Sequence, residues 1–204
     1  CIKNGIDEQT ANKIYDEMID FAKYAFNKSH AAAYAVVSYQ TAWLKYYFPV
    51  EYMAALMTSV IDNPSKVSEY IYACRQMNIK ILPPDINKGE ANFSVDGGNI
   101  RYGLAAIKSI GRPVIKAIVE DREELGLFQN LEDFITRLSA KNILNKRTIE
   151  NLIKAGALDT LGGTRKQFMS IYVQIVDHVT QEKKNSMVGQ MTLFDLVSED
   201  QKEE

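Results

Sequence analysis

Apolar residues recur at helical spacing along the first quarter of the chain. Residues 7–26 carry them on one face, and Asp7 stands where it can cap the start of the helix. Residues 29–47 are apolar on all sides, with Ser29 as the expected N-cap. The pattern therefore predicts an amphipathic helix followed by a second helix that is buried on most sides.

Prolines and asparagines divide the stretch that follows. Pro49 ends the second helix and fits the first turn of a third helix over residues 50–60. Asn63 and Pro64 start a fourth helix with one apolar face, and Pro83 stops the segment after helical spacing has been lost. We therefore expect two further helices and then a break.

The sequence Asp-Gly-Gly-Asn at residues 96–99 is typical of a tight β-turn. It separates residues 91–95 from residues 100–102, which predicts a small β-hairpin. From Leu104 the spacing of short helices returns and continues to about Lys184. The fold class that these patterns predict is mainly α with one small hairpin.

Capping residues mark two helix starts in the second half. Asn130 precedes a helix with an apolar face, and Thr164 forms a capping box with Gln167 at the start of a longer helix. Residues 185–204 are polar and acidic apart from an apolar cluster near Phe194. We expect these last residues to form a tail.

A glycine hinge follows the predicted β-hairpin. A short helix is expected to end near residue 107, and Gly111 would permit a tight turn before a helix that contains Arg112 and Lys116. Free amides and the dipole at that helix start form an anion site, to which Lys108, Arg112 and Lys116 add charge-assisted contacts to phosphate. Nothing in the run reads base edges, so binding should tolerate any sequence.

A second hinge is a degenerate copy of the first. Gly156 turns the chain after a helix over residues 148–154, and the next helix begins with Arg165 and Lys166. A single glycine between helices is most often an ordinary loop. Two copies with basic residues at the following helix start indicate contact with DNA.

These runs resemble the helix-hairpin-helix motif of proteins that bind DNA without sequence specificity. That motif has two glycines around the turn residue, and Ser109 occupies the place of the first glycine here. The resemblance implies that Lys108, Ser109, Gly111, Arg112 and Lys116 contact DNA. In the second copy the corresponding expected contacts are Gly156, Arg165 and Lys166.

Charge is distributed unevenly along the chain. The whole chain has a net charge of −2. Residues 100–170 hold 12 basic and 8 acidic residues, a net charge of +4, between segments of −2 and −4. A basic segment in an acidic chain fits a confined phosphate-contact site, and it also fits a solvated helical surface with scattered lysines.

Composition excludes several classes of protein. A hydrophobic content of 46% provides for a sizeable core and argues against wholesale disorder. No run of 18 apolar residues and no signal peptide is seen, so we expect neither a membrane span nor export. Cys1 and Cys74 have no metal or disulfide spacing, which fits a reducing cytoplasm, and a first residue other than Met indicates a piece of a longer chain.

Five distinctive strings occur along the chain in a fixed order. They are Phe26–Tyr34, Ser38–Lys45, Ile81–Asn87, Ala105–Lys108 and Ala155–Asp159. Together they resemble the alpha subunit of bacterial DNA polymerase III, the C-family of replicative polymerases. The likeness extends from residue 1 to about residue 197.

This resemblance implies a domain organisation. Residues 1–85 correspond to the C-terminal part of a helical fingers domain, residues 86–103 to a β-hairpin connector, residues 104–184 to a tandem helix-hairpin-helix region that binds duplex DNA, and residues 185–204 to an acidic tail with a clamp-binding peptide.

The resemblance also implies a nucleotide site in the fingers. A lysine beside a helix start suits a polyphosphate, and Lys28, Ser29, His30 and Tyr34 are the candidates for facing the deoxynucleoside triphosphate or the templating pair. The alternative is that Ser29 merely caps the helix while Lys28 is solvated and His30 packs.

The tail holds Gln190, Leu193 and Phe194, which are similar to the Gln-x-x-Leu-Phe peptide that binds the sliding clamp. Leu193 and Phe194 would enter an apolar cleft of the clamp, and Gln190 would make a polar anchor. The alternative is that this apolar pair packs back on its own domain.

Catalytic residues are not expected in this chain. Two-metal nucleotidyl transfer needs clustered carboxylates, and no Asp-x-Asp or palm-like pattern occurs. The family's palm, with its magnesium, would lie upstream of Cys1, so we expect no catalytic residue, metal or cofactor here and an inactive fragment of an active polymerase. Other replicase subunits are further expected partners.

Two other classes of protein remain open at this point. A helix-hairpin-helix DNA glycosylase or lyase would need a base-flipping pocket with a catalytic residue such as Asp159 or Lys166. A helical interaction module would have no role with nucleic acid, and it would not bind duplex DNA in a salt-dependent way.

Overall fold

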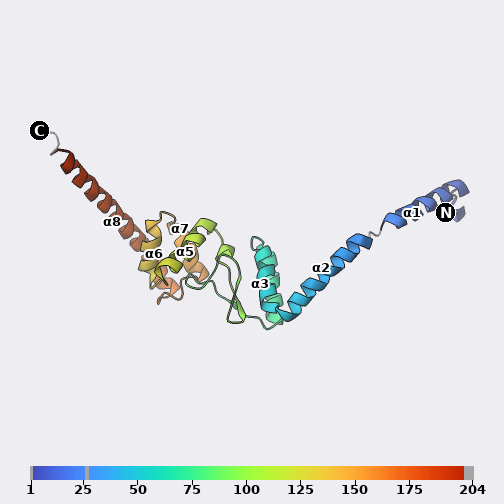
Figure 1. Ribbon diagram of the computed structural model, residues 1–204, viewed down its shortest axis with the longest axis horizontal. Helices are drawn as coiled ribbons and strands as arrows, with labels where there is room; N and C mark the ends of the chain where they lie inside the picture. The colour runs from blue at the N-terminus through green and yellow to red at the C-terminus, as the bar shows by residue number, and fades with distance from the viewer. Residues whose placement is uncertain (1, 26–27, 200–204) are drawn as a thin grey trace. The chain divides into compact units, whose positions relative to one another are not determined.

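The computed structural model describes the backbone of residues 2–25 and 28–199 and the side chains of residues 2–22 and 28–185 (Figure 1). The chain forms two compact units, residues 1–49 and residues 50–204. The predicted domain boundaries at residues 85, 103 and 184 remain predictions, and all three lie within the second unit.

The first unit consists of a 3-10 turn, η1 (Ile2–Asn4), and the helices α1 (Glu8–Ala25) and α2 (Lys28–Tyr47). Asp7 caps α1 as predicted, because its Oδ1 accepts a hydrogen bond of 2.8 Å from the amide of Thr10. Hydrogen bonds with the side chain and the backbone amide of Thr10 lower the pKa of the Asp7 carboxyl.

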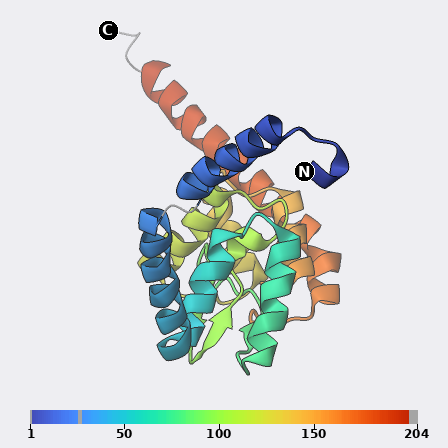
Figure 2. The same cartoon turned by 90° about the vertical axis from the view of Figure 1, so that its right-hand side faces the viewer.

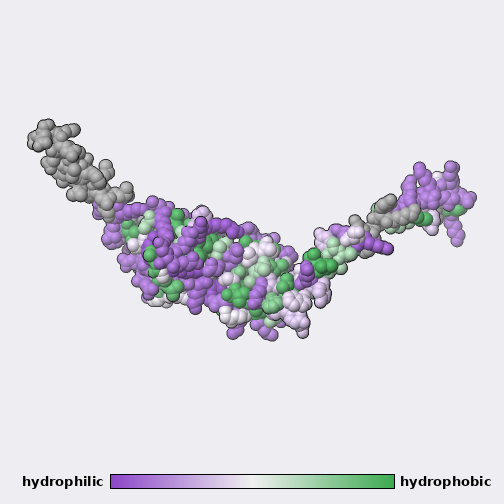
Figure 3. Space-filling model, viewed as in Figure 1, coloured by the Kyte–Doolittle hydropathy of each residue, from purple (hydrophilic) through white to green (hydrophobic). Residues whose placement is uncertain are grey.

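Two predictions about α2 are wrong. Ser29 is the second residue of α2 rather than its N-cap, because the helix already includes Lys28. No described residue of α2 is buried, and Figure 3 shows green, hydrophobic side chains along this helix in the face in view. Burial on most sides requires several packed elements, and the described part of this unit contains only η1, α1 and α2.

The second unit begins with two helices, α3 (Pro49–Ser59) and α4 (Pro64–Gln76), which stand side by side in Figure 2. Pro49 starts α3 and Pro64 starts α4, as predicted. Asn63 caps α4 by accepting a hydrogen bond from the amide of Lys66. Proline tolerates the first turn of a helix because the amide that it lacks has no intrahelical partner there.

The predicted β-hairpin is present and belongs to a three-stranded sheet. Strands β2 (Ser94–Asp96) and β3 (Asn99–Arg101) pair antiparallel across Gly97 and Gly98, whose φ angles are 58° and 78°. A two-residue turn with both φ angles positive favours glycine and matches the strand twist. The short strand β1 (Ile81–Leu82) adds a parallel edge to β3.

Helices α3 and α4 share one core with the sheet. Met57 and Cys74 are fully buried, and they cluster with Phe93 and with Ile100 of the central strand. Burial raises the pKa of the Cys74 thiol, so this cysteine behaves as a small apolar core residue.

A second core holds the rest of this unit together. It is built from the 3-10 turn η2 (Leu104–Ala106) and the helices α5 (Arg112–Leu125), α6 (Leu131–Ala140), α7 (Lys146–Ala155) and α8 (Arg165–Glu199). Figure 1 shows α5, α6 and α7 gathered around the start of α8. The fold is mainly α, as predicted.

The loop of residues 85–90 joins the sheet to the helices, and we call it the strap. The Ile86 amide donates to the Ala157 carbonyl at 3.0 Å, and Arg122 Nη1 donates to the carbonyls of Ile86 and Gly89 at 3.0 and 2.7 Å. Asn87 exchanges two hydrogen bonds of 2.9 Å with the backbone of Phe128. The strap therefore contacts the second glycine hinge, the last turn of α5 and the connection between α5 and α6.

Candidate nucleic-acid interface

The first hinge is a turn between η2 and α5, and its geometry corrects one prediction. Ser109 has φ 65°, in the left-handed region, whereas Gly111 has φ −75° and ψ 145°. The tight turn that was expected at Gly111 is therefore made at Ser109. A left-handed residue is needed where the chain reverses, and the family's first glycine, replaced here by serine, occupies that place.

Alternating burial fixes which side of this hinge faces solvent. Ile107 and Ile110 are each 8% exposed and anchor the turn in the core. Lys108 and Ser109, which lie between these two residues, and Gly111, which follows them, are exposed. The polar side of the turn is thus held outward by two apolar side chains.

The start of α5 is open. Its N-cap is Gly111, which makes no side-chain capping hydrogen bond, and Pro113 in the first turn has no amide hydrogen. Adding a Cβ at Gly111 would meet only Pro113 Cδ, at 3.5 Å. The Val114 and Ile115 amides donate to the Gly111 carbonyl at 3.1 and 3.3 Å, which leaves the Gly111 and Arg112 amides open within the described part of the chain. Open amides at a helix start carry partial positive charge and suit an anion.

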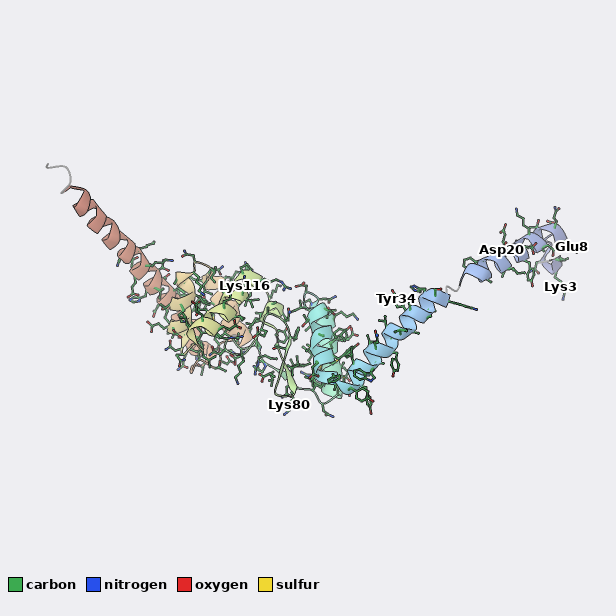
Figure 4. The ribbon with its side chains drawn as sticks, viewed as in Figure 1. Lys3, Glu8, Asp20, Tyr34, Lys80 and Lys116 are labelled. Carbon is green, nitrogen blue, oxygen red and sulfur yellow. The ribbon has the colours of Figure 1, made fainter. Side chains whose placement is uncertain are left out.

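Positive side chains surround this open start. Lys108 and Arg112 are exposed, and neither pairs with a carboxylate among the described residues. Lys116, one turn along α5 and labelled in Figure 4, is 76% exposed and lies 3.5 Å from Glu120, a weak surface pair. Four of the five predicted contacts of the first hinge therefore lie at or just before the start of α5. The fifth, Lys116, lies one turn further along the helix.

The second hinge connects α7 to α8. Gly156 is the C-cap of α7 with φ 82°, a left-handed conformation that ends helices and favours glycine. Thr164 and Gln167 form the predicted capping box at the start of α8. Lys166 is exposed.

Arg165 is bound within the protein. Its Nη2 lies 2.6 Å from Oδ2 of Asp159, and its Nε donates to both carboxylate oxygens at 2.9 and 3.1 Å. The hydrogen bond with Asp159 raises the pKa of the Arg165 guanidinium. The same hydrogen bonds engage the Asp159 carboxylate, which is the catalytic group that a DNA glycosylase or lyase would require.

A buried ion pair that the sequence pattern did not reveal joins α5 to α6. Asp121 of α5 is 1% exposed, and it accepts a hydrogen bond of 2.6 Å from Arg137 Nε of α6. Arg137 also lies over the ring of Phe128, 4.3 Å from its centroid, and Lys141 Nζ lies 3.1 Å from Asp121. The partners are 16 and 20 positions apart, beyond the reach of helical spacing.

The candidates of the first unit lie together on α2. Lys28, Ser29, His30 and Tyr34 fall within the first two turns, and the rings of His30 and Tyr34 have centroids 4.4 Å apart. Tyr34, labelled in Figure 4, is 60% exposed. Their role with a nucleotide stays a prediction.

The predicted clamp peptide falls on the last part of α8. The backbone is helical through residues 190–194, and the side chains of Gln190, Leu193 and Phe194 lie outside those that the structure describes. Within the described part of the chain, no cluster of His, Cys, Asp and Glu could hold a metal ion. None of the described helices is long and apolar enough to cross a membrane.

Two turn–helix pairs follow each other on one core, and residues 78–168 match the family model described as helix-hairpin-helix motif. The chain is 46% identical over 198 residues to DNA polymerase III subunit alpha of Vibrio cholerae. It is 46% identical over 199 residues to the subunit of Escherichia coli K12 and 42% identical over 191 residues to that of Mycobacterium tuberculosis.

The chain is therefore homologous, over 94–97% of its residues, to one segment of the DNA polymerase III alpha subunits, which confirms the resemblance drawn from its sequence strings. It spans 16–17% of the length of these relatives.

Proposed function

We propose that this chain is the part of a replicative DNA polymerase that holds the sugar-phosphate backbone of duplex DNA. The observation that carries the proposal is the uncapped start of α5 between the exposed cations Lys108 and Arg112. It lies in a helix-hairpin-helix motif whose relatives are named as polymerase subunits. Amides and cations that converge on one point suit a phosphate oxygen.

Binding at this site would be independent of base sequence. The open amides and the two cations reach phosphate without entering a groove, and the polymerase must pass every sequence that it copies. Each neutralised phosphate releases condensed counterions, so the affinity should fall steeply with salt.

The test is a salt titration of duplex binding by the 204-residue chain. Lys108→Gln combined with Arg112→Gln should flatten the slope of log K against log salt by about 1.8, since each phosphate contact contributes about 0.9. Arg75→Gln combined with Lys80→Gln is the matched control, because it removes the same charge from two exposed residues, in the last turn of α4 and directly before β1. An equal flattening of the slope in both double variants would show that the charges attract DNA without a defined site, and it would contradict the proposed site.

The remaining roles belong to the same proposal. Lys28, Ser29, His30 and Tyr34 would face the deoxynucleoside triphosphate in the complete polymerase. Gln190, Leu193 and Phe194 would bind the sliding clamp, and other replicase subunits would join the assembly. The catalytic carboxylates and their magnesium would belong to the palm of the complete polymerase.

A DNA glycosylase or lyase is the second candidate function. Against it stands the Asp159 carboxylate, which is already hydrogen-bonded to Arg165. An assay for cleavage at an abasic site separates the two functions, and we expect no cleavage by this chain.

A further inference from the structure

The two hairpins differ in how the start of their second helix is held. No side chain caps α5. At the start of α8, by contrast, the Thr164 amide donates to Gln167 Oε1 at 2.9 Å, and the Gln167 amide donates to Thr164 Oγ1 at 3.3 Å. Side chains therefore cap two amides at the start of α8. At α5 the Gly111 and Arg112 amides have no such cap from a described side chain, while the Val114 amide donates to the Gly111 carbonyl at 3.1 Å.

The arginines of the two hairpins differ as well. Lys108 and Arg112 at the first hairpin have no carboxylate partner among the described residues. Arg165 at the second makes three hydrogen bonds with Asp159 through Nε and Nη2. To reach a phosphate, Arg165 would first have to give up this forked contact, and it would leave Asp159 facing the anion.

The position of Arg165 depends on Gly156. A Cβ at Gly156 would lie 2.1 Å from Arg165 Nη2 and 2.9 Å from Asp159 Oδ2. The guanidinium thus lies over the left-handed end of α7, where Nη1 also points at the carbonyl of Lys154 at 3.4 Å. A cation at this place stabilises the last carbonyls of a helix.

We propose that the two hairpins have different roles, and that Arg165 is a positioning residue rather than a phosphate ligand. It clips the start of α8 to the end of α7 through Asp159 and so keeps the second hairpin closed. Phosphate contact by arginine is left to Arg112 of the first hairpin. This inference rests on the proposed function, since it divides the work of one DNA-binding region.

The experiment compares Arg165→Gln, Arg165→Lys and Arg112→Gln in the 204-residue chain, with the salt slope of duplex binding and the melting temperature as readouts. Lysine keeps the charge of Arg165 but lacks the fork that binds a carboxylate at two points. A clip predicts that both Arg165 variants melt about 1–4 °C lower and keep the slope of the unmodified chain. Arg112→Gln should keep the melting temperature and flatten the slope by about 0.9.

A second comparison isolates the clip itself. Asp159→Asn should lower the melting temperature as Arg165→Gln does, and the double variant should melt no lower than either, because both changes break the same contact. Additive losses would show that Arg165 does not act through Asp159 and would overturn the inference.

The remaining outcomes separate the inference from the function on which it rests. A slope that flattens by about 0.9 in Arg165→Gln and recovers in Arg165→Lys would make Arg165 a phosphate ligand and overturn the division of roles alone. Absence of salt-dependent binding by the unmodified chain would overturn the proposed function, and the division with it.

Discussion

Ser109 decides the shape of the first hairpin although a glycine stands two residues later. Its φ of 65° is a left-handed conformation that costs an L-residue about 1–2 kcal/mol. Gly111, at φ −75°, needs no such freedom for its own backbone. What Gly111 contributes is the lack of a side chain at an uncapped helix start, where a phosphate would approach the amides.

We predict that Ser109→Gly stabilises the chain. Relief of the left-handed strain outweighs the greater entropy of glycine in the unfolded chain, for a net gain of about 0.5–1 kcal/mol in denaturant unfolding. Ser68→Gly, at an exposed position inside α4, should instead cost about 0.5 kcal/mol. A loss of stability in both variants would show that the turn gains nothing from glycine.

Lys28 gives a test of the proposed nucleotide site at the same scale. Lys28→Ala in the complete polymerase should raise the KM for nucleotide, because a phosphate contact would be lost. Lys45→Ala, in the last turn of the same helix, is the control and should leave KM unchanged. Unchanged KM and kcat in Lys28→Ala would remove Lys28 from the site.

At the scale of elements, α5 and α6 are joined by the ion pair of Asp121 and Arg137. Asp121 is 1% exposed and Arg137 14%, so the charges compensate each other within the protein. Hydrogen bonds from Arg137 to the carbonyls of Asp121 and Gly126 extend the contact to the end of α5. This fixes α5, and with it the open helix start, on the core that both hairpins share.

We predict that Asp121→Ala lowers the free energy of unfolding by about 3 kcal/mol, because it leaves Arg137 and Lys141 without their shared carboxylate. The measurement is denaturant unfolding. Glu120→Ala, which removes only an exposed partner of Lys116, should change stability by less than about 0.5 kcal/mol. Similar small losses in both variants would mean that the buried pair contributes little.

Local signals account for most of what the sequence predicts at this scale. Asn63, Asn130 and Thr164 each cap the helix that was expected to follow them, since a cap involves residues only three positions apart. The parallel pairing of β1 with β3 was not predicted, because two residues carry too little pattern. The apolar character of α2 is evident in the sequence. An apolar pattern indicates that a helix favours burial, but it does not identify the element that would cover it.

The candidate site was predictable in its residues and not in its geometry. The basic residues and glycines of both hinges were recognised from the sequence. Their order does not show that Ser109 rather than Gly111 turns the chain, nor that Arg165 is bonded to Asp159. The φ angle of Ser109 and the pairing of Arg165 with the Asp159 carboxylate both depend on the folded structure, so the local sequence does not reveal them.

At the scale of the whole molecule, the proposed attachment to the clamp can be separated from the grip on DNA. Leu193→Ala combined with Phe194→Ala should abolish clamp binding, because these side chains would supply its apolar anchor, and it should leave duplex binding unchanged. Binding is measured to purified clamp and to duplex DNA in parallel. Met187→Ala combined with Val188→Ala is the matched control, and loss of clamp binding in the control alone would place the anchor elsewhere.

The strap has a consequence for how this protein can be divided. Two prolines precede the strap, and a glycine lies near its end. This composition is typical of a flexible linker between domains. Yet Ile86 is fully buried and Asp85 is 4% exposed, and Thr160 donates to the Asp85 carboxylate at 3.2 Å. A polypeptide begun at residue 104, the predicted start of the hairpin region, would therefore lack Ile86, a part of its own core. A hairpin region intended to fold by itself should begin near Val50.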